Sequence, residues 1–267
     1  MFDIICLMFL HDSLLWLRKH QFLFEELVKR DFKKKYKGTL LGIGWSVLQP
    51  LLMLLVLKLV FEQFFGRTVP HYTTYLFCGQ LLFHYFSESV GHGMKCLVSE
   101  AGIYGKVRIP KYIFLFAKNA QTFVNFLIIL AVFFFFCALD HIAFTWKFLL
   151  LVYPILTLTL FNIGLGLILS ALFVFFRDMD YLWRVFTRLL FYGSAIMYPI
   201  TNFSPETQRV FLINPVYMHI AYFRQITIDG TIPDLYGHLF ILGSALAAFL
   251  VGAVIYRKCN NRFLYYI

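Results

Sequence analysis

The chain has 267 residues, of which 60% are hydrophobic and only 14% are charged, and its mean hydropathy is +0.73. Charged residues make up roughly a quarter of an ordinary soluble domain, so this composition excludes a water-soluble globular protein and predicts one surrounded by lipid. The formal net charge of +10 does not indicate nucleic acid binding, because Lys and Arg beside apolar segments usually orient a membrane protein and contact anionic headgroups.

The first predicted element is an amphipathic helix over residues 21–37. Its apolar residues recur at helical spacing and form one stripe, made of Phe24, Leu27, Val28, Phe32 and Tyr36. The other faces carry charges that include Arg30 and Lys33. We expect this helix to lie in the cytoplasmic interface of the membrane. The alternative, a basic flank of the first span, would not need the apolar stripe.

Six segments are long and apolar enough to cross a bilayer, which takes about 20 residues of helix. They cover residues 40–61, 73–94, 113–139, 148–176, 182–200 and 235–256. The fourth is long enough to tilt, or to hold a break near Gly164 and Gly166. The fifth is the weakest, because Arg184 and Arg188 lie near its start. The sequence therefore predicts an all-α membrane protein with six transmembrane helices in one domain.

The distribution of basic residues predicts the orientation of these spans. The segments before the first span, between the second and third, between the fourth and fifth, and after the sixth hold most of the Lys and Arg. The loops on the opposite side hold only Arg67, Lys147, Arg209 and Arg224. Positive charge is retained in the cytoplasm, so both termini are expected there.

The external segment 201–234 is too apolar for a solvated loop. Prolines at 199, 205 and 215 interrupt it, which predicts short helices broken near Asn214-Pro215. Apolar helices that do not span the bilayer re-enter it or rest on it.

Several chemistries are not supported by the sequence. There is no G-x-x-x-x-G-K-[ST] loop, no H-E-x-x-H and no G-x-S-x-G. The charges inside or near the spans, such as Glu88 and Lys118, lie where they can reach an interface, and no deep acidic pair suggests a proton relay. The five cysteines have no C-x-x-C spacing and are interpreted as small hydrophobic residues.

Five motifs in chain order resemble the membrane subunits of type-2 ABC exporters for polysaccharides, the O-antigen, capsule and teichoic acid permeases. The resemblance covers nearly the whole chain. Its motifs are the basic run 30–42 followed by Trp45 and Leu48-Gln49-Pro50, then Leu97-Val98-Ser99, Lys106-Val107-Arg108-Ile109-Pro110, Phe176-Arg177-Asp178, and Met197-Tyr198-Pro199-Ile200 with Asn214-Pro215 and Arg224. Glu100 stands where the family often has Asn.

The resemblance implies roles for three groups of residues. A coupling loop over 97–111 would contact the ATPase through Ser99, Glu100, Tyr104, Lys106, Arg108 and Pro110. The interfacial helix would act through Phe24, Arg30, Phe32, Lys33 and Tyr36, and an external gate would include Asn214, Pro215 and Arg224.

The resemblance also implies partners. The chain would form a homodimer in the bacterial inner membrane and work with two ABC ATPase subunits on a lipid-linked polysaccharide. This chain would hold no metal or other cofactor, because the partner subunit binds ATP and magnesium.

Aromatic residues are abundant, at 20% of the chain. Trp45, Tyr85, Tyr192 and Tyr198 are candidate channel-lining residues, because aromatic rings stack on sugar faces. The alternative is that such rings face lipid or form an interface belt.

Two other functions remain open. One is a type-2 ABC exporter of a small lipid or drug, which fits poorly with a basic amphipathic helix that leads directly into the first span. The other is a membrane-embedded enzyme acting on lipid-linked sugars, which would need acidic or histidine residues clustered at one membrane face. The sequence shows no such cluster.

Overall fold

The computed structural model describes residues 21–104, 109–260 and 262–266, and within these ranges the chain is helical, with no strand. This agrees with the all-α class expected from the sequence. The elements are α2 (Gln21–Tyr36), α3 (Gly44–Phe65), α4 (Tyr72–Ser99), α5 (Ala101–Tyr104), α6 (Tyr112–Leu139), the 3-10 helix η1 (Trp146–Leu151), α7 (Val152–Phe175), α8 (Met179–Tyr192), η2 (Ile200–Asn202), α9 (Pro205–Ile213), α10 (Pro215–Thr227), α11 (Leu235–Cys259) and α12 (Phe263–Tyr266).

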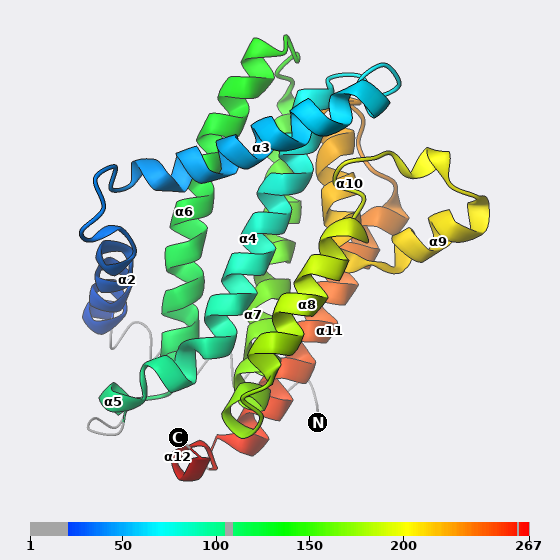
Figure 1. The fold of residues 1–267 in the computed structure, drawn as a ribbon. Helices are drawn as coiled ribbons and strands as arrows, with labels where there is room; N and C mark the ends of the chain where they lie inside the picture. Colours follow the sequence, from blue (N-terminus) through cyan, green and yellow to red (C-terminus); the bar gives the residue numbers. More distant parts are fainter. Residues whose placement is uncertain (1–20, 105–108, 261, 267) are drawn as a thin grey trace.

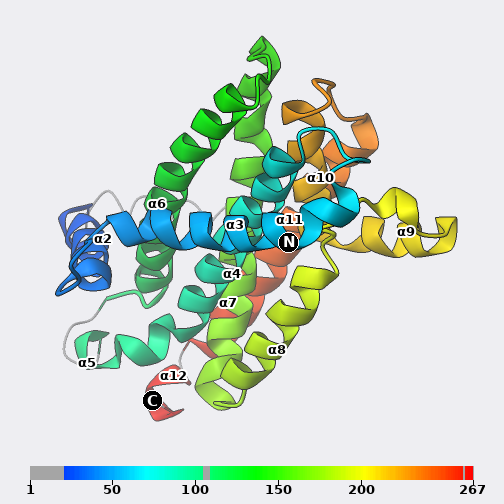
Figure 2. The same ribbon diagram turned by 45° about the horizontal axis from the view of Figure 1, so that its top comes forward.

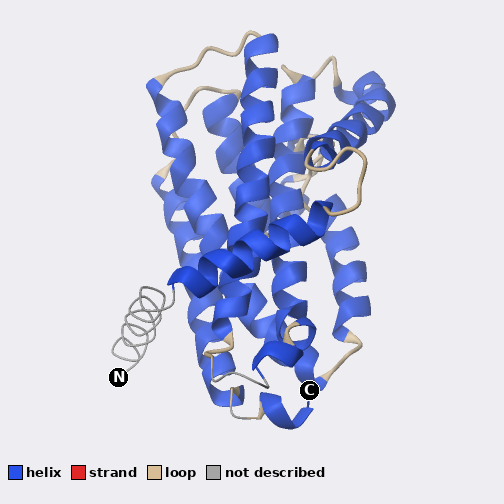
Figure 3. Ribbon diagram, turned by 90° about the vertical axis from the view of Figure 1, so that its left-hand side faces the viewer, coloured by secondary structure: helices blue, strands red, loops and turns tan. Residues whose placement is uncertain are grey.

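Four long helices, α4, α6, α7 and α11, stand side by side and form the body of the molecule (Figure 1). Helix α2 crosses this bundle at its side (Figure 3), and α3 runs obliquely over α4 and α6 (Figure 2). Because it crosses its neighbours, α3 leaves a long apolar face that the described residues do not cover, with Leu55 and Leu59 exposed at 55% and 65%.

Four helical segments in the described part of the chain have the length and hydropathy of membrane spans: α3, α6, residues 146–175 and α11. Helix α4 is 28 residues long but carries Gln80, His84, Glu88 and His92, and the other helices bury most of it. Helix α8 has only 14 residues. The structure thus supports a multi-pass membrane protein, and the predicted second and fifth spans are the two that do not meet these criteria.

The helix expected over residues 182–200 is shorter than predicted. Helix α8 ends at Tyr192, and Ala195 takes a left-handed backbone conformation with φ of 47°, which an α-helix cannot include. The irregular segment 194–197 that follows is fully buried. At a rise of about 1.5 Å per residue, α8 is roughly 21 Å long, which is less than the hydrocarbon thickness of a bilayer.

The fourth predicted span contains no break at its glycines. Helix α7 continues through Gly164 and Gly166, and these residues serve close packing instead. A Cβ atom on Gly164 would lie 2.5 Å from the backbone nitrogen of Phe249 in α11. A Cβ atom on Gly252 would lie 2.4 Å from the carbonyl oxygen of Gly164. Small residues thus allow α7 and α11 to make the most extensive helix contact in the chain.

We expect Gly252→Ala to destabilise the protein because the added methyl group forces α7 and α11 apart. Overpacking of this kind costs about 1–3 kcal/mol, measured as a lowered thermal unfolding temperature in detergent micelles. The matched control is Gly243→Ala in the same helix, where a Cβ atom meets nothing within 4 Å. Gly243→Ala should leave stability unchanged or slightly raised. Equal effects of the two substitutions would contradict the close approach.

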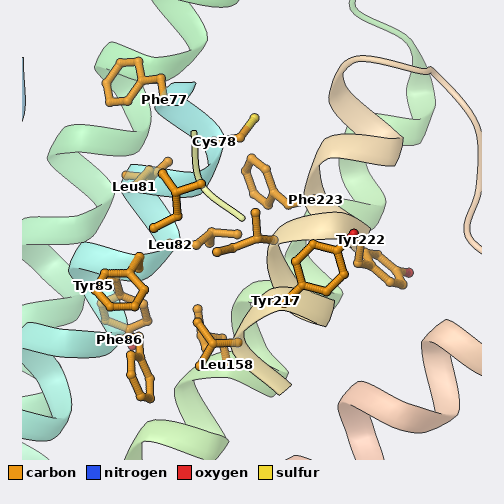
Figure 4. Close-up of a cluster of buried hydrophobic side chains, with 14 of the residues drawn as sticks. Phe77, Cys78, Leu81, Leu82, Tyr85, Phe86, Leu158, Tyr217, Tyr222 and Phe223 are labelled. Carbon is orange, nitrogen blue, oxygen red and sulfur yellow. The ribbon is translucent and has the colours of Figure 1, made fainter. Parts of the chain in front are cut away.

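The main hydrophobic core lies between α4, α6, α7 and α10, and Figure 4 shows part of it. Phe77, Tyr85 and Phe223 are each at most 1% exposed there. A second cluster closes the other end of the bundle and includes Leu27, Leu97, Phe114, Tyr256 and Phe263. Residues from α2, α4, α6, α7, α11 and α12 therefore meet at this end, where Phe263 represents the final turn.

The segment expected to contain broken helices holds two. Helix α9 ends at Ile213 and α10 begins at Pro215, because the Asn214 side chain accepts a hydrogen bond from the Val216 amide at 3.0 Å and proline suits the first helical turn. Helix α9 is largely exposed, whereas α10 is buried against α4, α7 and α11.

Candidate functional site

An ionic network joins α2 to the ends of α4 and α6 near the predicted coupling loop. The Arg30 guanidinium donates to Asp31 at 2.8 Å and to Glu100 at 2.8 Å. The Lys118 ammonium lies 2.8 Å from Asp31 and 3.3 Å from Glu100. Each carboxylate therefore contacts both cations, and the three helices are held by one group of four charges.

This network is largely shielded from solvent. The Asp31, Glu100 and Lys118 side chains are 5%, 7% and 17% exposed. The Arg30 side chain is 38% exposed and lies on the solvent side of the network. Burial opposes the Arg30 charge, but hydrogen bonds and charges from Asp31 and Glu100 outweigh it and raise the pKa of Arg30 above its ordinary value. Two carboxylates facing two cations make the group neutral, which is the condition for burying charges.

A second set of polar contacts attaches the end of α2 to the middle of the bundle. Lys35 forms an ion pair with Glu88 of α4, and the Tyr36 hydroxyl donates to Asn125 of α6 at 2.6 Å. Together with Leu27 in the second hydrophobic cluster, these contacts fix α2 along its whole length.

The C-terminal residues support the same region. The Lys111 ammonium, at the start of α6, donates to the carbonyl of Asn260 at 2.7 Å and lies 5.4 Å from the ring of Phe263. Phe263 is fully buried, and its ring packs against Tyr256 at 5.2 Å. Asn260 and Phe263 therefore contact the residue at which the predicted coupling loop joins α6.

The predicted coupling residues fall into different environments. Ser99 is exposed at the end of α4, whereas Glu100 is buried in the ionic network. Pro110 is half-buried, and its carbonyl accepts from the Ile113 amide at 3.2 Å. Tyr104 ends α5, and Lys106 and Arg108 lie outside the described residues. Glu100 therefore contacts residues of the chain itself, and its predicted contact with the ATPase stays a prediction.

The residues predicted on α2 divide between two faces. Phe24 packs against the second hydrophobic cluster, and Phe32 contacts the Tyr36 ring edge-on at 5.3 Å. Lys33 is exposed. Sequence reasoning missed Asp31 and Lys118 as functional residues, and the available signal was a lone acid within a basic run and a lone lysine within an apolar span.

The connection from α7 to α8 holds another ionic contact. The Asp180 carboxylate pairs with Arg184 and, at 2.7 Å, with Lys95 of α4. The buried Trp183 indole lies next to Gly91 of α4. The start of α8 is thereby tied to α4, although the rest of α8 has few partners in the chain.

Arg224 in α10 connects α4 to the irregular segment 194–197. Its guanidinium donates to the carbonyls of Tyr75, Ala195 and Ile196 at 3.1, 2.9 and 2.8 Å, and lies 3.5 Å from the centre of the Tyr75 ring. The residue is 6% exposed. Asn214 adds a contact to the same irregular segment by donating to the carbonyl of Gly193 at 3.0 Å. These two residues hold the break after α8 against α4 and α10.

The four candidate lining aromatics are not equivalent. Tyr85 is 1% exposed, and its hydroxyl bonds Thr159 at 2.9 Å, so it belongs to the packing within the chain. Trp45 and Tyr192 are exposed at 42% and 56% on α3 and α8. Tyr198 is half-buried against Phe203 and Phe211.

A helical bundle with span-length apolar helices is the architecture of a multi-pass membrane protein. The profile of the ABC-2 type transporter family matches residues 23–228, which cover most of the chain. The chain therefore belongs to the ABC-2 type transporter family.

Several curated proteins align with nearly the whole chain. The O-antigen export system permease protein RfbA of Klebsiella pneumoniae is 25% identical over 91% of this chain and 95% of its own length. The protein of the same name from Myxococcus xanthus is 27% identical over 78% of this chain and 81% of its own length. The polysialic acid transport protein KpsM of Escherichia coli is 22% identical over 90% and 94%.

Proposed function

We propose that this chain is the permease subunit of an ATP-driven exporter of a lipid-linked cell-surface polysaccharide. One observation carries the proposal: the chain aligns almost end to end with proteins named as permeases for O-antigen export. The alternatives are export of a small lipid or drug by the same family, and enzymatic action on lipid-linked sugars.

In this proposal, six helices cross the bacterial inner membrane with both termini in the cytoplasm. The asymmetry of basic residues supports this orientation. Helix α4 would cross inside the bundle, shielded by its neighbours, and α8 with the buried segment 194–197 would form the fifth crossing. Irregular backbone is tolerated at membrane depth where protein buries it.

Two copies of the chain would form the channel and two ABC ATPase subunits would drive it. The exposed apolar faces of α3 and α8 support a homodimer, with Leu59, Val185 and Leu189 each more than 60% exposed. ATP and magnesium would be bound by the ATPase. Its closure would reach the membrane through the loop 97–111 and through α2, because the ionic network makes these parts move together.

The external helices α9 and α10 would close the channel on the outer side. Arg224 and Asn214 support this role because they fix the break after α8 against α10. Polymer would pass only when this closure is released.

The proposal predicts that deleting the gene removes the polysaccharide from the cell surface and leaves lipid-linked polymer inside the cell. The measurement is surface glycan by lectin or antibody binding, together with extraction of lipid-linked glycan. The intact gene should restore export, and it should fail to do so when the neighbouring ABC ATPase is inactivated. Unchanged surface glycan with altered efflux of small amphiphiles would support the drug or lipid exporter instead.

A further inference from the structure

A polar pocket lies where α2, α3, α4 and α6 meet, apart from the ionic network and from the Arg224 contacts. Its volume is about 420 Å³, within the range of roughly 300–1,000 Å³ that is typical of small-ligand sites. Trp45 and Tyr36 contribute aromatic surface, Gln49 and Asn125 contribute amides, and Lys35 and Glu88 contribute charges. Polar pockets among apolar helices are costly in a membrane, so they indicate function.

The charges in this pocket neutralise each other. Lys35 pairs with Glu88, and the second Glu88 oxygen accepts from Asn125 at 3.5 Å and lies 3.7 Å from His84. The pocket therefore presents no net charge to attract a phosphate or a cation. In the described part of the chain, no group of three His, Cys, Asp or Glu side chains is placed to hold a metal ion.

The remaining lining favours a molecule with both hydroxyl groups and C–H faces. The π face of an indole is negative and attracts polarised C–H groups, so Trp45 provides a stacking surface. The carboxylate and amide groups of the lining form a hydrogen-bonding wall that provides acceptors and donors for hydroxyls. A pocket that combines aromatic and hydrogen-bonding groups is complementary to a sugar ring, whose faces are apolar and whose rim is polar.

The position of the pocket agrees with this ligand. It opens beside the connection between α2 and α3, where Gly38 and Gly42 have φ of 79° and 52°. Leu40 at the tip of this connection is fully exposed next to the basic end of α2. Under the membrane arrangement proposed above, this connection lies at headgroup depth, where the first sugars of a lipid-linked glycan are located.

We propose that this pocket binds a single uncharged sugar unit, so that Trp45 stacks on the ring while Glu88, Gln49 and Asn125 bond its hydroxyls. The inference rests on the proposed function and extends it by assigning a saccharide subsite within one chain. It also gives Trp45 a role in binding cargo at the start of α3, rather than in lining the channel between chains.

The test uses the full chain in nanodiscs and a panel of methyl glycosides with different ring configurations. Saturation-transfer NMR should detect ring C–H protons of at least one glycoside bound to the wild type. Trp45→Ala should weaken that binding roughly tenfold, as loss of an aromatic stacking partner does elsewhere, and Trp45→Phe should largely restore it. Glu88→Gln tests the hydrogen-bonding wall and should also weaken binding.

The matched control is Trp146→Ala, since Trp146 is 67% exposed on η1 and does not line the pocket. This variant should bind like the wild type. Unfolding temperatures of all variants identify any that are misfolded, and Trp45→Phe keeps the test informative if Trp45→Ala is unstable. The proposal is overturned if no glycoside binds, if Trp45→Ala binds normally, or if inorganic pyrophosphate occupies the pocket in a way that Lys35→Met abolishes.

Export measured with the same variants separates this inference from the proposed function. If the wild-type chain restores surface glycan but binds no glycoside, the sugar-binding role of the pocket is contradicted and the exporter function stands. If glycoside binding depends on Trp45 but the chain restores no surface glycan, the exporter function is contradicted and the pocket still binds a sugar.

Discussion

Replacing Lys118 with methionine is expected to destabilise the protein by about 3 kcal/mol and to abolish export. The substitution leaves the buried carboxylates of Asp31 and Glu100 facing each other with only Arg30 between them. Breaking a buried ion pair by removing one partner is costly because a buried charge is left uncompensated. The measurements are the unfolding temperature in detergent and the surface glycan of complemented cells.

Two controls make this prediction sharp. The double variant Glu100→Gln with Lys118→Met removes one negative and one positive charge, so it should be closer to the wild type than Lys118→Met alone. Glu26→Ala removes an exposed acid from α2, the helix that carries Asp31, and both Glu26 and its partner Lys29 are solvent-exposed. Glu26→Ala should change stability by less than about 1 kcal/mol. A double variant worse than either single variant would show that charge balance is not what holds the network.

ATP hydrolysis and export by the Lys118→Met variant distinguish a role of the network in coupling from a role in stability. If it transmits ATPase movement, Lys118→Met assembled with the ATPase at a temperature where it remains folded should hydrolyse ATP without exporting polymer. Normal export by the folded variant would contradict the coupling role and leave a structural one. Asp31 and Lys118 belong to different helices, 87 positions apart, so no local sequence pattern indicated that they meet.

Hydropathy predicted long helices such as Tyr112–Leu139 well, because most of their residues are apolar. It was less informative for α4, whose polar residues are covered by neighbouring helices rather than by lipid. Hydropathy also placed the end of the fifth span too late, at residue 200, whereas the helix ends at Tyr192. There the backbone leaves the helical conformation to offer carbonyls to Arg224, a partner about 30 residues away, and a single-segment criterion cannot detect such a partner.

The candidate site was only partly accessible from the sequence for the same reason. The α2 stripe predicted a helix that lies in the membrane interface, whereas the structure buries Leu27 of this stripe against the bundle. It did not indicate that Asp31 would be buried as well, because a buried acid depends on cations supplied from elsewhere. Tyr85 was equally ambiguous, since an aromatic residue in a span is suited to a channel, to lipid or to a core, and its neighbours Phe126 and Thr159 place it in the core.

Replacing Arg224 with methionine is expected to have the second large effect. Methionine has a similar length but cannot donate, so the carbonyls of Tyr75, Ala195 and Ile196 lose the hydrogen bonds that the guanidinium gives them. At roughly 1 kcal/mol for each lost hydrogen bond, the cost is about 3 kcal/mol. Arg224→Lys should recover only part of it, because an ammonium cannot reproduce the planar fork. The unfolding temperature measures the loss.

If Arg224 also holds the external end closed, the methionine variant should let small ions or dyes leak through proteoliposomes that the wild type keeps sealed. Arg209→Met is the matched control, because Arg209 is exposed on α9 in the segment 201–234 that also contains Arg224. A second route leads to the same disturbance: a Cβ atom on Gly79 of α4 would lie 2.7 Å from an Arg224 nitrogen and 3.3 Å from the Ile196 Cα atom. Gly79→Ala should therefore reproduce the leak with Arg224 intact. Leak from Arg224→Met without leak from Gly79→Ala would point to the charge of Arg224, and not to the seating of the segment after α8, as the property that closes the channel.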